Sequence, residues 1–158
     1  MVCTEAERLS ALLKEKKLTL SVAESCTGGM ISSRITDIPG SSEFFVGSAV
    51  TYSDTSKTTV LNVCKETIKK HGAVSAEAAE EMSAGAMEVF HSDVSAAVTG
   101  IAGPSGGSDT KPVGLVFISV RYGNKLRTTK NIFKGSRTEI RSAASDAVMS
   151  EIIRMVEE

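Results

Sequence analysis

The residues of this sequence best suited to chemistry are a serine and a lysine, each placed just after a strand-like segment. Ser25 lies in the polar, glycine-containing stretch 24–29, and Lys57 follows a later strand-like run. A serine hydroxyl is a weak nucleophile until a base removes its proton. A lysine can be that base when burial lowers the pKa of its amine. Since neither His71 nor His91 is near these stretches, a Ser–Lys pair is the economical arrangement.

Each of these residues also has a simpler interpretation. Ser25 and Thr27 can cap a helix that begins after the glycines, and Lys57 can be a solvent-exposed lysine on a helix face. Cys26 is a rival nucleophile, but it points away from Ser25 if the strand continues, so only one of the two faces a cleft. We favour a structural Cys26. Glu24, next to Ser25, is also a candidate to contact the substrate; its side chain either orients Lys57 or faces solvent.

A third polar stretch, residues 100–107, follows a strand-like segment that ends at Thr99. In open α/β sheets, ligands bind beyond the carboxyl ends of the strands. A strand, a polar loop and a helix start together expose backbone N–H groups that can bind an anion. We therefore expect the three loops to converge on one site.

The last of these loops is our candidate for binding a phosphate, with help from nearby basic side chains. The simpler interpretation is a flexible glycine loop and, for the two arginines, an exposed helix face. Spacing does not say which basic residue reaches the ligand. The candidates for this role are Gly103, Gly106, Gly107, Lys111, Arg137 and Arg141.

The elements that must position these groups alternate between helix and strand. Apolar spacing predicts helices over 4–17, 30–38, 53–63, 75–90 and 136–157, the first with a capping-box pattern at Thr4 and Glu7. Alternating and β-branched residues predict strands over 18–23, 44–52 and 94–99, and a hairpin over 113–133. This order indicates an α/β fold whose sheet is covered on both faces. The hairpin makes the sheet mixed, and residues 1–158 form a single domain.

Composition narrows the classes of protein. A hydrophobic content of 41% and a net charge of −1 fit a globular chain, and they argue against direct nucleic-acid binding, which favours a basic excess. No apolar run approaches the roughly 18 residues of a membrane span. Three cysteines without a CxxC pair indicate free thiols, so we expect a cytoplasmic protein with no metal site.

Four motifs together resemble the CinA C-terminal domain family, in order and over nearly the whole chain. They are Ala-Glu-Ser-Cys-Thr-Gly-Gly (23–29), Val-Thr-Tyr-Ser-x-x-x-Lys (50–57), Gly-Ala-Val-Ser-Ala-Glu with Glu-Met-Ser-Ala-Gly-Ala (72–77, 81–86), and Thr-Gly-Ile-Ala-Gly-Pro-Ser-Gly-Gly with Lys-Pro-Val-Gly (99–107, 111–114). The chain departs from the family at 54–56, where Asn-Glu-Ala is common, and at Ser136, where Asp is common. Neither departure removes a proposed catalytic group.

The resemblance implies a stand-alone nicotinamide-nucleotide amidase, which converts nicotinamide mononucleotide to nicotinate mononucleotide and ammonia in pyridine nucleotide salvage. It also implies a three-layer α/β/α sandwich with a mixed, mostly parallel sheet. By motif, Ser25 is the nucleophile, Lys57 the base, and Tyr52 and Thr99 line the same site. No cofactor or metal is needed. Candidate oxyanion donors are the backbone N–H groups of Thr27, Gly28 and Gly29.

Two alternatives stay open. The same loops could hold a nucleotide without turning it over, which makes the chain a binding module. The family's competence-related name suggests an interaction protein in DNA uptake or repair. We expect a small-molecule nucleotide as the substrate and neither nucleic acid nor a membrane as a partner, and the small size of the chain makes a homo-oligomer an expectation as well.

Overall fold

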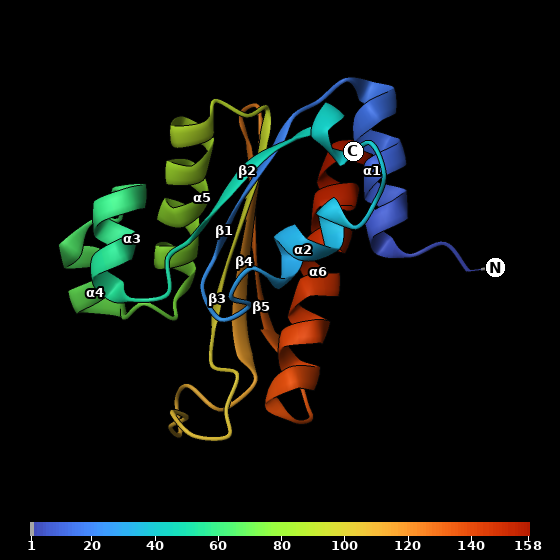
Figure 1. The fold of residues 1–158 in the computed structure, drawn as a ribbon. Coiled ribbons are helices and arrows are strands. Elements are labelled where there is room, and N and C mark those ends of the chain that lie inside the picture. The colour runs from blue at the N-terminus through green and yellow to red at the C-terminus, as the bar shows by residue number, and fades with distance from the viewer. Residues whose placement is uncertain (1) are drawn as a thin grey trace.

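A five-stranded sheet lies between two layers of helices in the computed structural model, which describes residues 2–158 (Figure 1). The helices are α1 (Glu5–Lys16), α2 (Met30–Thr36), α3 (Asp54–Leu61), α4 (Lys65–His71), α5 (Ala76–Phe90), α6 (Arg137–Glu157) and the 3-10 helix η1 (Ser41–Glu43). The strands are β1 (Leu20–Glu24), β2 (Phe45–Val50), β3 (Val94–Gly100), β4 (Leu115–Tyr122) and β5 (Lys125–Ile132). The predicted fold class is confirmed. The sequence pattern misses η1 and α4 because neither contains a buried residue.

The strand order β2-β1-β3-β4-β5 brings the carboxyl ends of three strands, β1, β2 and β3, to the same end of the sheet. β1 pairs in parallel with both β2 and β3, whereas β4 is antiparallel to β3 and β5 is antiparallel to β4. The sheet is therefore mixed, and β4 alone runs against the other strands. Glu24 at the end of β1 is in register with Val50 at the end of β2 and with Val98 in β3. The loops that follow these strands consequently leave the sheet side by side.

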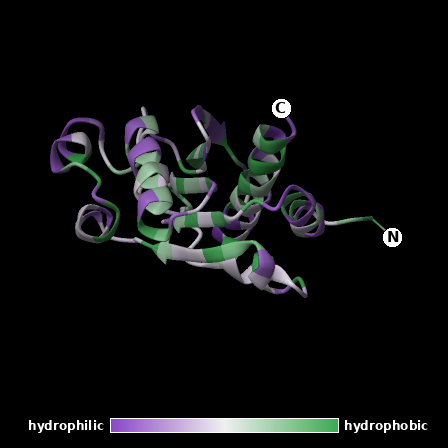
Figure 2. Ribbon diagram, turned by 90° about the horizontal axis from the view of Figure 1, so that it is seen from above, coloured by the Kyte–Doolittle hydropathy of each residue, from purple (hydrophilic) through white to green (hydrophobic). Residues whose placement is uncertain are grey.

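One face of the sheet is covered by α1, α2 and α6 over a large apolar core (Figures 1 and 2). α6 buries Ile140, Ala144, Val148 and Ile152 at four-residue intervals, a spacing that keeps side chains on one side of a helix. At 21 residues, α6 is long, but no helix in residues 2–158 is apolar enough over a sufficient length to cross a membrane.

The opposite face is covered by α5, and α3 and α4 pack outside it (Figure 1). Here the buried residues are small or carry hydroxyls. Ala79 is fully buried, and the Oγ atoms of Ser83 and Ser119 lie 3.0 Å apart in the interior. A Cβ added at Gly85 would overlap the backbone carbonyl of Leu61, so this glycine lets α3 approach α5 closely. We call this face of the sheet the thin face, because its apolar core is smaller than that of the other face and contains buried hydroxyl groups.

Most of the longer helices begin at a hydroxyl residue that accepts a hydrogen bond from a backbone N–H in the first turn. The predicted capping box is present, with Thr4 accepting from the Glu7 N–H and the Glu7 side chain accepting from the Thr4 N–H. Ser53, Ser75 and Ser136 cap α3, α5 and α6 in the same way. α2 differs, because its N-cap is a glycine with no side chain to accept these bonds.

Candidate active site

Ser25 and Lys57 meet in the interior at the border where the parallel strands end. The Lys57 Nζ lies 3.0 Å from the Ser25 Oγ. Ser25 directly follows β1, and Lys57 projects from the first turns of α3, the helix that follows β2. Only 7% of Ser25 and 1% of Lys57 is exposed to solvent. The pair proposed from the sequence is therefore one hydrogen-bonded unit, and the interpretation of Lys57 as a solvated lysine is wrong.

The amine of Lys57 is held in a fixed direction by the backbone. Besides its contact with Ser25, the Nζ donates to the carbonyl of Thr51 (2.8 Å) and to the carbonyl of Tyr52 (3.1 Å). Burial is the main cause that lowers the pKa of this amine, and the negative charge of Asp54 opposes it. A neutral amine has two N–H groups and one lone pair. In the neutral amine, the two carbonyls can take the two N–H groups, which leaves the lone pair for the Ser25 hydroxyl.

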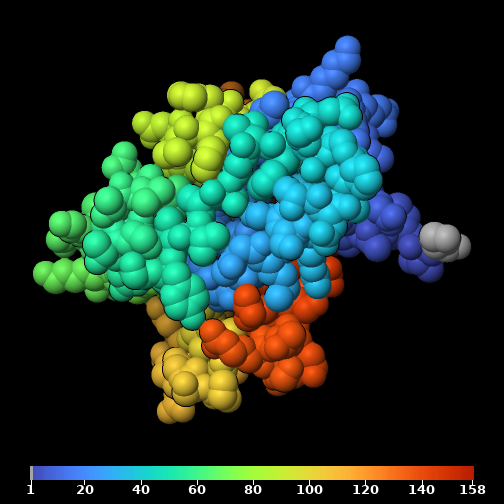
Figure 3. Space-filling view, in the orientation of Figure 1, coloured from blue at the N-terminus to red at the C-terminus, as the bar shows by residue number. Residues whose placement is uncertain are grey.

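A cleft of about 210 Å³ opens over this pair. The three predicted loops do converge on it, and in the space-filling view the segments around residues 25, 52 and 137 adjoin (blue, teal and orange in Figure 3). Gly100 and Ala102, from the predicted loop 100–107, also line it. So do three residues with no predicted role, Asp54, Ala73 and Val74, and the 72–77 motif is the signal that could have pointed to the last two. The full lining is Ser25, Cys26, Tyr52, Asp54, Lys57, Ala73, Val74, Thr99, Gly100, Ala102 and Arg137.

Tyr52 and Arg137 form the mouth of the cleft. Tyr52 is 61% exposed, and its hydroxyl accepts a hydrogen bond from the Arg137 Nη2 (3.2 Å). The Arg137 Nη1 donates to the carbonyl of Gly103 (2.7 Å). Arg137 thus ties the end of β2 and the glycine-rich loop to the start of α6. It is the one member of the predicted basic set, Lys111, Arg137 and Arg141, that lines the cleft.

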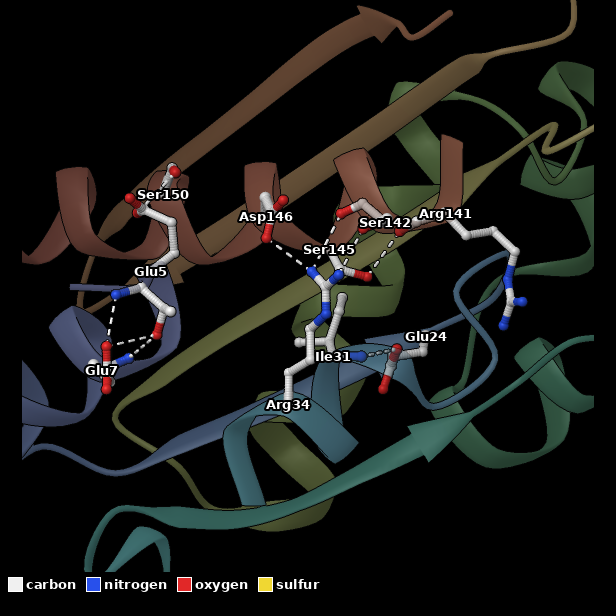
Figure 4. A network of polar contacts seen from close by, with 11 residues as sticks. Glu5, Glu7, Glu24, Ile31, Arg34, Arg141, Ser142, Ser145, Asp146 and Ser150 are labelled. Carbon is white, nitrogen blue, oxygen red and sulfur yellow. Dashed lines mark hydrogen bonds and ion pairs between the residues drawn. The ribbon is translucent and has the colours of Figure 1, made fainter. Parts of the chain in front are cut away.

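Arg141 and Lys111 act instead as struts between segments of backbone. The Arg141 Nε donates to the carbonyl of Cys26 (3.0 Å) and its Nη2 to the carbonyl of Thr27 (2.9 Å). Figure 4 shows this side chain reaching from α6 toward the loop after β1. The Lys111 Nζ donates to the carbonyl of His71 (2.6 Å), the last residue of α4. Both side chains thus bind backbone carbonyls, and neither lines the cleft.

The glycine-rich loop contributes to the site through its first residues. Gly103 is buried with a φ of +77°, and a Cβ there would overlap the side chain of Val113. Gly106 and Gly107 are exposed and lie outside the cleft lining. Thr99 lines the cleft, and its hydroxyl donates to the carbonyl of Ala73 (2.8 Å), which fixes the 72–77 motif against β3.

Glu24 follows neither of the two interpretations given for it. Its side chain is fully buried, so it does not face solvent. Its carboxylate oxygens accept hydrogen bonds from α2 and from the turn that leads into α2, and none from Lys57. The carboxylate accepts from the Thr27 hydroxyl (2.6 Å), the Ile31 N–H (3.0 Å), the Ser32 N–H (3.1 Å) and the Ser32 hydroxyl (2.6 Å). Figure 4 shows the contact with Ile31. Glu24 does not line the cleft, and neither do the residues that donate to its carboxylate, so the structure does not bring it to the candidate site as a substrate contact.

Cys26 has the properties of a structural thiol. It is 7% exposed, and burial raises the pKa of its thiol to about 11, so the thiol stays protonated and weakly nucleophilic at neutral pH. Cys3 and Cys64, the other cysteines, are exposed and unpaired by disulfides. Among residues 2–158, no three His, Cys, Asp or Glu side chains gather in a way that could hold a metal ion.

The turn after Ser25 leaves several backbone N–H groups without a protein acceptor. Gly28 and Gly29 adopt φ values of +59° and +101°, which favour glycine. The Gly28 N–H donates to the carbonyl of Ser25 (3.1 Å) and is therefore occupied. Within residues 2–158, the N–H groups of Cys26, Thr27 and Gly29 have no hydrogen-bond partner. Two of the three predicted oxyanion donors, Thr27 and Gly29, are thus free.

Comparison with known proteins places the chain in a family. Residues 3–156 match the model of the CinA C-terminal domain. A CinA-like protein of Petrotoga mobilis is 47% identical over 152 residues, which is 96% of this chain and 38% of the relative. A CinA-like protein of Thermotoga neapolitana is 44% identical over 147 residues, 93% of this chain and 36% of the relative. The chain spans about a third of the length of these curated relatives.

Solved structures agree in fold over the full length. The competence/damage inducible protein CihA of Agrobacterium tumefaciens superposes with a TM-score of 0.93 at 37% identity, covering 98% of this chain and 94% of that one. A Competence-Damaged Protein (CinA) superfamily protein of Klebsiella pneumoniae gives 0.94 at 30% identity, with 97% and 96% covered. Sequence and structure together show that this chain belongs to the CinA C-terminal domain family.

Proposed function

We propose that the chain is an amidohydrolase that converts nicotinamide mononucleotide to nicotinate mononucleotide and ammonia through an acyl-enzyme on Ser25. The observation that carries the proposal is the 3.0 Å contact between the Lys57 Nζ and the Ser25 Oγ inside a cleft. A surface lysine of unaltered pKa would be protonated and unable to take a proton at neutral pH. Burial lowers the pKa of Lys57 and so favours the amine that a base requires.

The first half of the reaction forms the acyl-enzyme. The Ser25 Oγ attacks the carboxamide carbon while its proton passes to the Lys57 amine. Negative charge develops on the carboxamide oxygen, and the free N–H groups of Thr27 and Gly29 are suitable donors for it. The resulting ammonium of Lys57 then gives its proton to the departing nitrogen, the C–N bond breaks, and ammonia leaves.

The second half reverses these roles with water. Lys57 takes a proton from water, the hydroxide attacks the ester carbon, and the proton returns to the Ser25 Oγ as the carboxylate product leaves. The two carbonyls that bind the Nζ keep the amine in place through both halves. Fixed geometry of this kind lowers the entropic part of the barrier.

The rest of the nucleotide fits the charge and shape of the mouth. The exposed ring of Tyr52 offers an apolar surface next to the narrow cleft, and the guanidinium of Arg137 stands beside it. A guanidinium binds phosphate in a bidentate manner. We therefore assign the phosphate to Arg137 in preference to Arg141 or Lys111, because Arg137 is the one of these three residues that lines the cleft.

The direct test is ammonia release from nicotinamide mononucleotide by the purified protein, with the acid product identified by chromatography. Ser25→Ala should fold normally and lose at least about 10³-fold in kcat. A wild-type protein that binds the nucleotide without releasing ammonia would favour the binding-module alternative. Wild-type turnover by Ser25→Ala would reject the serine mechanism.

We also propose that the expected homo-oligomer is a dimer built on β2. β2 is an edge strand of the sheet, carries no charged residue, and exposes 48% of Val46 and 49% of Val50. The other border strand, β5, carries lysines and an arginine, which discourage pairing. Two antiparallel β2 strands centred on Ser48 would place Val46 opposite Val50 of the partner subunit. Sedimentation should show a dimer that Val46→Lys converts to a monomer; a wild-type monomer would contradict the proposal.

A further inference from the structure

Glu24 is a buried carboxylate next to the nucleophile, and the mechanism above gives it no part. It is fully buried, and all of its hydrogen-bond donors are hydroxyls or backbone N–H groups, with no basic side chain among them. An uncompensated buried charge is unfavourable unless several donors stabilise it. We propose that Glu24 is a positioning residue that fixes the Ser25 turn against α2. The inference rests on the proposed function, in which Ser25 is the nucleophile.

The first argument is that Glu24 supplies the cap that α2 lacks. The N-cap residue Gly29 has no side chain, so the N–H groups in the first turn of α2 need another acceptor. One oxygen of Glu24 accepts from the Ile31 N–H, and the other accepts from the Ser32 N–H. The start of α2 is thereby attached to the last residue of β1, and the turn between them has a fixed span.

The second argument is that the same carboxylate also binds a residue within the turn that follows Ser25. The oxygen that binds Ile31 also accepts from the Thr27 hydroxyl, two residues after Ser25. The Ser32 hydroxyl, which donates to the other oxygen at 2.6 Å, also lies 2.6 Å from the Ser48 Oγ on β2. The carboxylate therefore links β1, the Ser25 turn and α2, and Ser32 extends the link to β2.

The third argument is that the backbone of Glu24 supports the base. The carbonyl of Glu24 accepts from the Thr51 N–H (2.9 Å), and the carbonyl of Thr51 accepts from the Lys57 Nζ (2.8 Å). The side chain of Glu24 thus fixes the turn that carries Ser25, and its backbone carbonyl fixes Thr51, whose own carbonyl binds the Lys57 amine. A displacement of Glu24 would change the distance between Ser25 and Lys57.

One consequence concerns where an anion can bind. A helix start after a strand is a common site for phosphate. Here the carboxylate of Glu24 occupies the Ile31 and Ser32 N–H groups and carries negative charge. The phosphate is therefore kept away from the start of α2. The N–H groups of Cys26, Thr27 and Gly29 stay free for the smaller oxyanion.

The test compares Glu24→Gln with Glu7→Gln, a matched control. Glu7 caps α1 by accepting from the Thr4 N–H and hydroxyl on the exposed surface, away from the cleft. In Glu24→Gln the amide NH₂ would face a donor, so we expect kcat to fall by about 10- to 100-fold, with KM changed less than about threefold. Glu7→Gln should leave kcat and KM as in the wild type. Equal loss in both variants, or a Glu24→Gln loss confined to KM, would overturn the proposal.

A second readout does not need the nucleotide. The rate at which a fluorophosphonate reagent labels Ser25 reports the readiness of the hydroxyl, and it should fall in Glu24→Gln by a factor similar to that in kcat. If the wild type is labelled well but does not hydrolyse the nucleotide, the substrate assignment is wrong. The ratio of the labelling rates of Glu24→Gln and the wild type then still decides whether Glu24 positions Ser25. Should the wild type resist labelling, the nucleophile assignment falls, and amide exchange at Ile31 and Ser32 decides whether Glu24 holds the turn.

A milder variant guards against loss of fold in Glu24→Gln. Ser32→Ala removes the hydroxyl donor but keeps the Ser32 N–H contact with the carboxylate. We expect kcat to fall by about three- to tenfold with an unchanged circular dichroism spectrum. Wild-type kcat and labelling in a well-folded Ser32→Ala, together with wild-type labelling in Glu24→Asp, would contradict a positioning role.

Discussion

The two faces of the sheet are built from different kinds of residue. The face under α1, α2 and α6 has a large core of leucine, isoleucine, valine and methionine side chains. The face under α5 has a small core in which alanines predominate, with buried serines between them. Each large aliphatic side chain contributes about 1.5–3 kcal/mol when fully buried. The first face therefore supplies most of the hydrophobic stabilisation.

The thin face is the one from which the proposed catalytic base is supplied. Small residues such as Gly85 let α3 approach α5, and α3 carries Lys57 into the interior. Larger side chains between α3 and α5 would push α3 outward and move the Lys57 amine away from the Ser25 hydroxyl and from the two backbone carbonyls that hold it. The comparison indicates that stability and chemistry are divided between the two faces, and the predictions below test that division.

The largest expected effect is on the base itself. Lys57→Met keeps the apolar stem and removes the amine, so kcat should fall by at least about 10³-fold while the protein still folds. Steady-state kinetics and circular dichroism measure the two quantities. A variant that keeps more than a tenth of the wild-type kcat would show that another group is the base.

The pH dependence of the reaction should follow the same amine. Below the lowered pKa of Lys57 the amine is protonated, so kcat/KM should rise about tenfold per pH unit and level off before the ordinary pKa of a lysine. Between those two values the unfolded chain binds a proton that the folded chain lacks, so stability should also rise with pH in that window. Lys57→Met should lose the rise in stability. Identical stability curves for the two proteins would refute the lowered pKa.

A smaller change on the thin face should affect both stability and chemistry. In Gly85→Ala the new methyl group meets the Leu61 carbonyl at the end of α3, so α3 must shift with Lys57. We expect a loss of about 1–3 kcal/mol in unfolding free energy, together with a fall of several-fold in kcat. Urea denaturation and kinetics test this. An unchanged kcat beside lowered stability would show that the spacing of α3 and α5 does not set the position of the base.

The matched change on the opposite face, under α1, α2 and α6, should affect stability alone. Ile152→Ala opens a cavity in the core under α6 and should cost about 2–5 kcal/mol of unfolding free energy. At a temperature where the variant is fully folded, kcat should stay within about twofold of the wild type. A marked fall in kcat would mean that the two faces are coupled more tightly than their composition indicates.

Local sequence signals predict much of the fold. The capping box at Thr4, the apolar spacing of α6 and the strand pattern of the hairpin over 113–133 each specify structure within a short segment, and each is present. α4 escapes prediction because its seven residues bury nothing and its N-cap residue, Cys64, makes no side-chain cap. Such a helix has neither of the two signals that pattern analysis uses.

The site is predictable only where topology fixes it. Parallel strand ends must lie side by side, so the proximity of Ser25 and Lys57 follows once the strands are recognised. The roles of Glu24 and Arg141 do not follow, because they depend on the direction in which a side chain leaves a turn and on the packing of α6 against it. Both residues hold the turn after Ser25, where the sequence analysis expects them to bind substrate.

The most direct test of the central claim is mass spectrometry of the protein quenched during turnover of nicotinamide mononucleotide. We predict that the peptide containing Ser25 gains the mass of the nucleotide minus ammonia, and that Ser25→Ala shows no such gain. The same adduct on Cys26, or steady ammonia release with no adduct on rapid quenching in either protein, would contradict the account.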